Sequence, residues 1–373
     1  MANKQKGLIF ISNVQKALEH EWFCDYVNKE EFDLEFILFN SKDSDLYNYI
    51  SSKGFKCKNY TLTSKFLIPF FVIFFFVKSL FRGYDFIHCH LFEASIIGII
   101  TGKLAGIKKR IYTRHHADFH HVYFPNAVKY DLLVNKHATH IIAVSNNILQ
   151  ILVELEGVPE HKITVIPHGI PKAVLNKNIS IQEVEAMKSR YQITSYSPII
   201  GVVSRFTKWK GIQYIIPAFK ELLNDFPNSK LVLANARGEY ENEIMKLLKE
   251  LPENSYTLIP FENNMPALFK SFDVFVHTPI DKTSEAFGQV YIEALGLKVP
   301  MVCTLSGIAN DFITNNNNAK VVKHENSEDV YEGILSLLNN QDLKEKIISQ
   351  GFMDVQNFTF EKKFEKLKQV YLI

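Results

Sequence analysis

The sequence predicts an α/β protein made of two Rossmann-like, doubly wound domains. Three observations support this fold class. The chain has 373 residues, more than a single hydrophobic core usually organises. Short β-branched and aromatic runs alternate with longer helical patterns along most of the chain, which is typical of parallel sheets covered by helices on both faces. Twelve such runs are found, and two sheets of about six strands fit that number better than one open sheet.

The expected strands form two groups. They are residues 8–12, 34–39, 86–90, 110–113, 140–144 and 163–166 in the first half, and 199–203, 230–234, 256–260, 274–277, 300–304 and 320–322 in the second. Helical patterns lie between them, for example at 212–223, 241–251 and 329–338. A Pro-His-Gly turn, a polar Asn-Lys-Asn run and one amphipathic helix near 182–191 separate the groups. We therefore expect an amino-terminal domain over 1–170, a carboxyl-terminal domain over 171–355 and a final helical segment over 356–373.

Composition and charge exclude several classes of protein. Apolar residues make up 47% and charged residues 22%, as in ordinary globular proteins. The net charge of +2 argues against a generally basic nucleic-acid-binding protein, so no nucleic-acid partner is expected. The four cysteines are far apart and form no CxxC pair, which indicates neither a zinc site nor a disulfide framework and favours a cytoplasmic protein. The apolar run at 8–11 is too short for a secretory signal.

The strongest chemical signal is a pair of glutamates, Glu285 and Glu293, placed around the start of a predicted helix. In a doubly wound sheet, ligands lie where strands end and helices begin. The amides of Phe287, Gly288 and Gln289 are therefore expected to face an anion, with the two carboxylates accepting hydrogen bonds from hydroxyl groups. The alternative is that Glu285 only caps the helix and that Glu293 is a solvated surface residue.

A second signal is a pair of cations after the strand at 199–203. Arg205 follows this strand, and Lys210 with Gly211 begins the next helix. Two cations at the carboxyl edge of a sheet suit a pyrophosphate, whose charge otherwise requires a metal ion. The alternative is a basic surface loop.

Together these segments resemble the family 4 glycosyltransferases, which have the GT-B fold and retain the configuration of the sugar. Glu285 and Glu293 match the E-x7-E signature, and Arg205 with Lys210-Gly211 resembles the R-x4-KG element. Three further segments resemble family motifs in the family's order: Ile166-Pro-His-Gly-Ile170 the IPNGV hinge, Asp85-Phe-Ile-His-Cys-His90 the D-x-I-H-x-H strand, and Tyr112-Thr-Arg-His-His116 the T-x-H strand end. The resemblance covers roughly residues 85–340 and implies two domains that face each other across a cleft. It also implies that the final helix crosses back to the first domain.

The resemblance also implies roles for these residues. Glu285 would hold the hydroxyls of the donor sugar and Glu293 the ribose of a UDP- or GDP-linked nucleotide sugar. Arg205 and Lys210 would neutralise the leaving diphosphate, so neither a metal ion nor a cofactor is expected. His115 would lie at the sugar, and His116 is its rival for that place. Further donor contacts are expected from two loop residues, Arg237 and Phe261.

One segment departs from the family pattern. The family usually has a glycine-rich loop after the first strand, but residues 12–20 contain no glycine. Lys16 and His20 are candidates to take over the contacts of the missing backbone amides.

An apolar run at 66–77 contains six phenylalanines but is too short to cross a bilayer. No acidic residue stands between Asp45 and Asp85, although several lysines do. This pattern favours shallow insertion into an anionic leaflet. We expect four phenylalanines (Phe70, Phe71, Phe74 and Phe75) to enter the leaflet and three cations (Lys65, Lys78 and Arg82) to contact headgroups. The alternative is a helix buried against the sheet.

The sequence therefore predicts a retaining glycosyltransferase of cell-surface polysaccharide or glycolipid synthesis. It would be peripheral at the cytoplasmic face of the membrane and would use a lipid-linked or glycan acceptor. One alternative is a nucleotide-sugar 2-epimerase of the same fold, which releases its product without an acceptor. Another is a catalytically silent glycosyltransferase-like binding protein.

Overall fold

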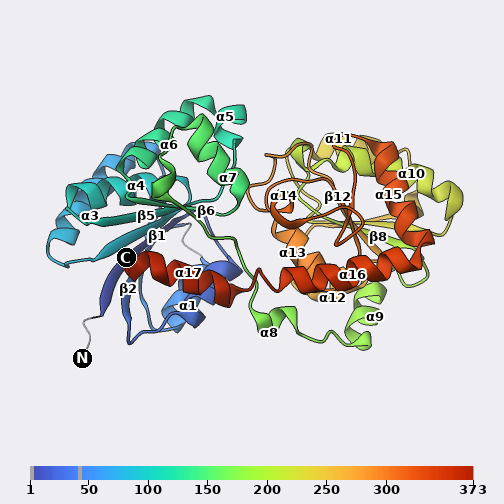
Figure 1. Cartoon of the computed structure of the whole chain (residues 1–373), viewed down its shortest axis with the longest axis horizontal. Helices are drawn as coiled ribbons and strands as arrows, with labels where there is room; N and C mark the ends of the chain where they lie inside the picture. Colours follow the sequence, from blue (N-terminus) through green and yellow to red (C-terminus); the bar gives the residue numbers. More distant parts are fainter. Residues whose placement is uncertain (1–3, 41–43, 373) are drawn as a thin grey trace. The chain divides into compact units, whose positions relative to one another are not determined.

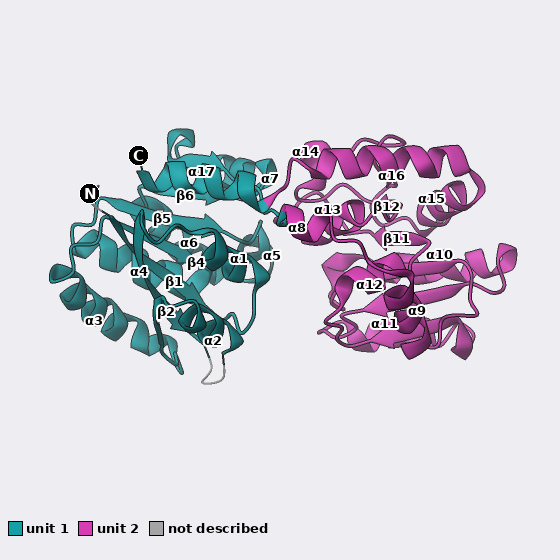
Figure 2. Cartoon of the chain, turned by 90° about the horizontal axis from the view of Figure 1, so that it is seen from below, with its two compact units in different colours: residues 1–171, 360–373 teal, residues 172–359 magenta. Residues whose placement is uncertain are grey.

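The computed structural model describes residues 4–40 and 44–372, and the chain divides into two compact units. Unit 1 comprises residues 1–171 and 360–373, and unit 2 comprises residues 172–359 (Figure 2). Each unit holds one parallel sheet with helices on its faces (Figure 1), so the predicted fold class is confirmed. Residues 356–359, which the sequence placed with the final segment, belong to unit 2.

Unit 1 has a seven-stranded sheet in the order β3-β2-β1-β4-β5-β6-β7. Its strands are β1 (Gln5–Ser12), β2 (Phe32–Phe39), β3 (Lys56–Asn59), β4 (Phe86–His90), β5 (Lys109–Arg114), β6 (His140–Ala143) and β7 (Ile163–Val165). The edge strand β3 was not predicted from the sequence. Its residues alternate between exposed and half-buried, and two of the four are lysines. A polar edge strand of this kind lacks the apolar run that marks the strands inside the sheet.

The helices of unit 1 form a layer on each face of the sheet. One face is covered by α3 (Ile68–Leu80), α4 (Phe92–Leu104) and α6 (Pro125–His137), with the short helices α5 (Phe119–Tyr123) and α7 (Asn146–Gln150) beside them. The other face is covered by α1 (Leu18–Tyr26), α2 (Asp45–Ser52) and the last helix, α17 (Phe360–Leu372) (Figure 1). Tyr371 anchors α17, since its ring stacks on that of Phe86 at 4.3 Å. Its hydroxyl lies 2.7 Å from Nδ1 of His88.

Unit 2 has a six-stranded sheet in the order β10-β9-β8-β11-β12-β13. Its strands are β8 (Ile199–Val203), β9 (Lys230–Ala234), β10 (Tyr256–Ile259), β11 (Val274–His277), β12 (Met301–Cys303) and β13 (Lys320–Val321). Its helices are α8 (Lys172–Leu175), α9 (Ile181–Arg190), α10 (Ile212–Asp225), α11 (Glu241–Leu248), α12 (Met265–Lys270), α13 (Gln289–Gly296), α14 (Ala309–Phe312), α15 (Ser327–Asn339) and α16 (Gln341–Val355). Apolar residues of α10, α11 and α15 form the core with the central strands.

Helix α3 has one side buried against the sheet and one exposed side. Part of the prediction for residues 66–77 is therefore corrected. Phe71 and Phe75 are buried against the sheet, so the expectation that they enter a membrane is wrong. Phe70 and Phe74 are exposed, as expected. No helix in the described part of the chain is long and apolar enough to span a bilayer.

The cations near α3 also differ from one another. Lys78 is ion-paired with the buried carboxylate of Glu35, so its predicted contact with headgroups is wrong. Lys65 and Arg82 are exposed, as that contact requires.

Candidate active site

The predicted site residues of unit 2 follow the carboxyl ends of four neighbouring strands. Arg205 follows β8, Arg237 follows β9, Phe261 follows β10, and Glu285 lies in the loop after β11. Strands β9 and β10 lie on one side of β8, and β11 to β13 lie on the other side, so the strand order reverses between β8 and β11. Ligands of doubly wound sheets bind at this switch point. The topology therefore brings separate parts of the sequence to one edge of the sheet.

Glu285 is buried and surrounded by polar partners. Its carboxylate is ion-paired with the ammonium of Lys210 and accepts a hydrogen bond from Nε2 of His277 at 3.0 Å. Its backbone amide donates to the hydroxyl of Ser306 at 3.0 Å. Burial alone raises the pKa of Glu285, but Lys210 and His277 outweigh it and lower the value to about 2. Glu285 is therefore an ionised acceptor held in a fixed position rather than a simple helix cap.

Two of these partners were not predicted as site residues. His277 is the last residue of β11, and Ser306 follows β12. His277 could have been identified as a candidate site residue, because it is a polar residue at the end of a predicted strand and the loop that carries Glu285 follows it. Burial lowers its pKa, so His277 acts as a neutral hydrogen-bond donor.

Gly211 explains how Lys210 reaches Glu285. The backbone at Gly211 is left-handed, with φ at +72°, and a Cβ there would lie 1.7 Å from the carbonyl oxygen of Thr278. Only glycine permits this close approach. The contact holds the loop after β8 against the loop after β11, which places the predicted Lys-Gly pair beside the predicted glutamate.

The amino terminus of α13 is built around Gly288. This residue has φ of +86°, and a Cβ would lie 2.6 Å from the ring of Tyr291. The helix begins at Gln289, and the first amides of a helix have no partner within it. The side chain of Phe287 is buried and packs near the ring of Phe358, so it supports this turn.

Glu293 lies inside α13 and has an environment opposite to that of Glu285. It is half-buried, and burial raises its pKa to about 7. Among the described residues, none forms a hydrogen bond with its carboxyl group. It is therefore neither a solvated surface residue nor part of an ion pair. A carboxyl group in this state is suited to exchange hydrogen bonds with the hydroxyls of a ligand.

The remaining predicted residues of unit 2 are exposed. Arg205 and Arg237 are exposed in adjacent loops, which are joined by a hydrogen bond from the Phe206 amide to the Arg237 carbonyl at 2.9 Å. The ring of Phe261 is 67% exposed. These residues are accessible to a ligand at the sheet edge, as their proposed roles require.

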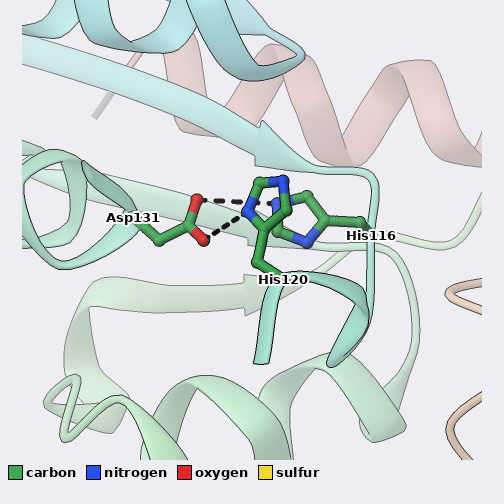
Figure 3. A group of neighbouring side chains, drawn as sticks. All are labelled: His116, His120 and Asp131. Atoms are coloured by element: carbon green, nitrogen blue, oxygen red, sulfur yellow. Dashed lines mark hydrogen bonds and ion pairs between the residues drawn. The ribbon is translucent and has the colours of Figure 1, made fainter. Parts of the chain in front are cut away.

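In unit 1, His115 and His116 follow β5 and have different neighbours. Nε2 of His115 lies 3.1 Å from Nδ1 of His90, and its ring stacks on His168. The ring of His116 contacts Asp131 and His120 instead (Figure 3). Burial holds the pKa of His115 well below its usual range and lowers that of His116 to about 4. Both imidazoles are therefore neutral at physiological pH.

The glycine-free loop leads into a partly buried ionic group that the sequence did not predict. Nδ1 of His168 lies 2.7 Å from Oε2 of Glu19 and 3.0 Å from Nζ of Lys363, and Lys363 is paired with Glu19. His168 stands where the family motif has asparagine, and its imidazole takes part in this group. His20 is buried with its ring 4.8 Å from that of His90, whereas Lys16 is exposed.

Two family models match this chain. The model described as "Glycosyltransferase Family 4" matches residues 24–173, and the model described as "Glycosyl transferases group 1" matches residues 183–353. Together they cover most of both units, with one model matching in each.

Individual relatives point the same way. The chain is 28% identical over 239 residues to the capsular polysaccharide biosynthesis glycosyltransferase CapM of Staphylococcus aureus, covering 63% of this chain and 61% of that protein. It is 25% identical over 400 aligned positions to the UDP-Gal:alpha-D-GlcNAc-diphosphoundecaprenol alpha-1,3-galactosyltransferase of Escherichia coli, covering 97% of this chain and 94% of that protein. The fold is similar to that of Anabaena HepE in its structure in complex with UDP and glucose. The TM-score is 0.83 at 18% sequence identity, and the superposition covers 97% of this chain and 98% of the HepE chain.

Proposed function

We propose that this chain, which belongs to the family 4 glycosyltransferases, transfers a sugar from a UDP- or GDP-linked donor with retention of configuration. The observation that carries this proposal is the ionised carboxylate of Glu285, held between Lys210 and His277 at the switch point of the unit 2 sheet. A fixed carboxylate beside a cation suits a ligand that presents sugar hydroxyls next to a diphosphate.

In this proposal the diphosphate binds at the amino terminus of α13. The amides of Gly288 and Gln289 and the helix dipole attract its charge. Arg205 and Lys210 then neutralise the charge that grows on the diphosphate as the bond to the sugar breaks. Preorganised charges of this kind usually supply the largest catalytic contribution, and here they take the place of a metal ion.

The other residues hold the remaining parts of the donor. Glu285 accepts hydrogen bonds from hydroxyls of the sugar, since it is ionised over the whole physiological range. Glu293 binds the ribose, and its raised pKa allows it to exchange hydrogen bonds without a fixed partner. Arg237 and the exposed ring of Phe261 contribute to binding of the nucleotide. From unit 1, His115 contacts substrate as a neutral hydrogen-bonding group, which suits it better than His116 because the latter is engaged by Asp131.

We propose further that the acceptor is a lipid-linked saccharide or glycan at an anionic membrane surface, in polysaccharide or glycolipid synthesis. The names of the Staphylococcus aureus and Escherichia coli relatives refer to capsular polysaccharide synthesis and to a diphosphoundecaprenol-linked acceptor. The outer side of α3 supports a membrane contact because it is apolar along its length, with Phe70, Ile73, Phe74 and Val77 exposed. Lys65 precedes this row and Arg82 follows it, so cations lie at both ends.

Donor binding followed by product analysis tests the proposal. Purified protein is screened for a thermal shift against a panel of UDP- and GDP-sugars, and the donor that stabilises it is incubated with and without membrane lipids. We expect labelled sugar to enter the lipid fraction when lipids are present, and no epimer to be released when they are absent. Release of an epimer without lipid would identify a 2-epimerase, and a thermal shift without any turnover would identify a silent binding protein.

A further inference from the structure

We propose that His116, His120 and Asp131 of unit 1 form a binding site for one divalent transition-metal ion of the zinc type (Figure 3). Each residue offers one ligand atom, and these atoms all lie within 4.8 Å of one another. Nδ1 of His120 is 2.6 Å from one oxygen of Asp131, and Nε2 of His116 is 3.6 Å from the other. One carboxylate therefore faces two imidazole nitrogens.

Three neighbouring segments position these groups. His116 lies two residues beyond the end of β5, His120 lies in α5, and Asp131 lies in α6. The side chains of His116, His120 and Asp131 are 24%, 12% and 7% exposed. Burial already restricts the movement of these three side chains, so a bound metal ion would restrict it only slightly more. The partial exposure of His116 gives the ion a route from solvent.

The charges around the site favour a cation. Arg114 is buried between two carboxylates, with its guanidinium 3.4 Å from Asp131 and 2.5 Å from Glu156. One arginine neutralises only one of them, so a negative charge remains in a buried place, which is costly unless it is paired. A metal ion bound by the Asp131 carboxylate would supply a positive charge at this place.

Space and ligand chemistry agree with an ion. A cavity of about 20 Å³ lies beside the three residues and is lined by His116 and Asp131 but not by His120, so it has room for one water-sized group next to these two ligands. Two imidazoles and one carboxylate are a ligand set that zinc accepts, with water in the fourth position. Arg114 holds the ligating carboxylate from outside, as partners of metal ligands commonly do.

The ion would stabilise the segment that carries His115. His115 and His116 are adjacent, so fixing His116 also fixes the backbone at His115. The hydrogen bond between His120 and Asp131 already joins α5 to α6, and the ion is therefore expected to add stability rather than to be required for folding. This inference is independent of the donor site in unit 2.

Metal binding to the purified, tag-free chain tests the proposal. Zn²⁺ affinity is measured by competition with a chromophoric chelator, and Co²⁺ serves as a spectroscopic probe. We expect one tightly bound ion per chain and a rise in Tm with Zn²⁺. His120→Gln should weaken binding by roughly 100-fold or more, in line with the losses seen when groups around a metal are removed. The matched control is His121→Gln, because His121 neighbours His120 but contacts Glu156 instead, and it should bind Zn²⁺ as the unaltered chain does.

A second variant keeps the test decisive if His120→Gln does not fold. His120→Cys replaces the imidazole by a thiolate, so the Co²⁺ complex should gain a sulfur-to-metal charge-transfer band. Absence of tight Zn²⁺ binding in the unaltered chain would overturn the proposal. So would equal weakening by His120→Gln and His121→Gln, or a Co²⁺ complex of His120→Cys without the thiolate band.

Discussion

The ammonium of Lys210 is ion-paired with the carboxylate of Glu285, although the two residues are 75 positions apart in the chain. They meet because β8 and β11 are neighbours in the sheet and because Gly211 lets the two following loops touch. A donor diphosphate at α13 would find this cation already in place. The energy needed to position it is supplied during folding rather than during the reaction.

Gly211→Ala tests the loop contact. A left-handed backbone costs a non-glycine residue about 1–2 kcal/mol, and here the added Cβ would also collide with the Thr278 carbonyl. We expect a loss of unfolding free energy well beyond that strain, measured by urea denaturation. Gly106→Ala is the matched control, because Gly106 has φ of +70° with nothing within 4 Å of its Cβ position. Equal losses in both variants would show that the Thr278 contact does not restrict this position.

The pH dependence of stability tests the environment of Glu293. Its pKa in the folded chain is raised from 4.5 to about 7, so its ionisation should destabilise the fold as pH rises from about 4.5 through 7. Glu293→Gln should therefore raise the unfolding free energy at pH 8 by roughly 1–3 kcal/mol and have little effect at pH 4.

Glu285→Gln is the opposite control for that experiment. The pKa of Glu285 is lowered to about 2, so its contribution is present above about pH 4.5 and is lost as pH falls toward 2. This variant should be less stable than the unaltered chain at neutral pH. Parallel pH profiles for the two variants would contradict the assigned environments.

Transfer should not need Mg²⁺ or Mn²⁺. In the proposed mechanism Arg205 and Lys210 supply the positive charge at the donor site, so the initial rate should be unchanged when EDTA is present. Zinc lost from unit 1 is expected to lower Tm but not this rate, which is therefore measured well below the melting temperature. A rate that disappears with EDTA and returns only with Mg²⁺ or Mn²⁺ would contradict the charge assignment.

Vesicle sedimentation tests the membrane contact. Each cation near an anionic surface contributes about 1 kcal/mol, so Lys65→Gln with Arg82→Gln should reduce binding to anionic vesicles at low salt. Lys249→Gln with Lys346→Gln is the matched control, because both lysines are exposed in unit 2. Phe70→Ser with Ile73→Ser should also reduce binding and leave the fold intact, since both side chains are exposed. Equal binding by all variants, or none by the unaltered chain, would remove the membrane proposal.

Much of the architecture could be predicted because the inner strands carry continuous apolar runs. The sequence placed β4, β8, β9 and β11 at the bounds that the structure has. Strand β3 was missed because a polar edge strand has no such run. The two sides of α3 were not separated either, since a nearly all-apolar helix contains no periodic signal for which phenylalanines are buried.

The residues of the candidate site could be named from the sequence, but the contacts between them could not. Glu285 and Lys210 could be identified from their motifs, whereas the role of His277 depends on where a strand ends beside a loop. The group of Glu19, His168 and Lys363 joins three segments, and two of its members are 344 positions apart. No local pattern reports such a contact, because it forms only when α17 packs on the rest of unit 1.

The most direct test of the account is steady-state sugar transfer by Lys210→Ala and Arg205→Ala. If these residues stabilise the leaving diphosphate, kcat should fall by about 10²–10³ for each variant while the KM for donor changes little. Lys208→Ala is the matched control, since Lys208 is exposed in the same loop, and it should keep normal kcat. Full activity in the Arg205→Ala, Lys210→Ala double variant would contradict the account.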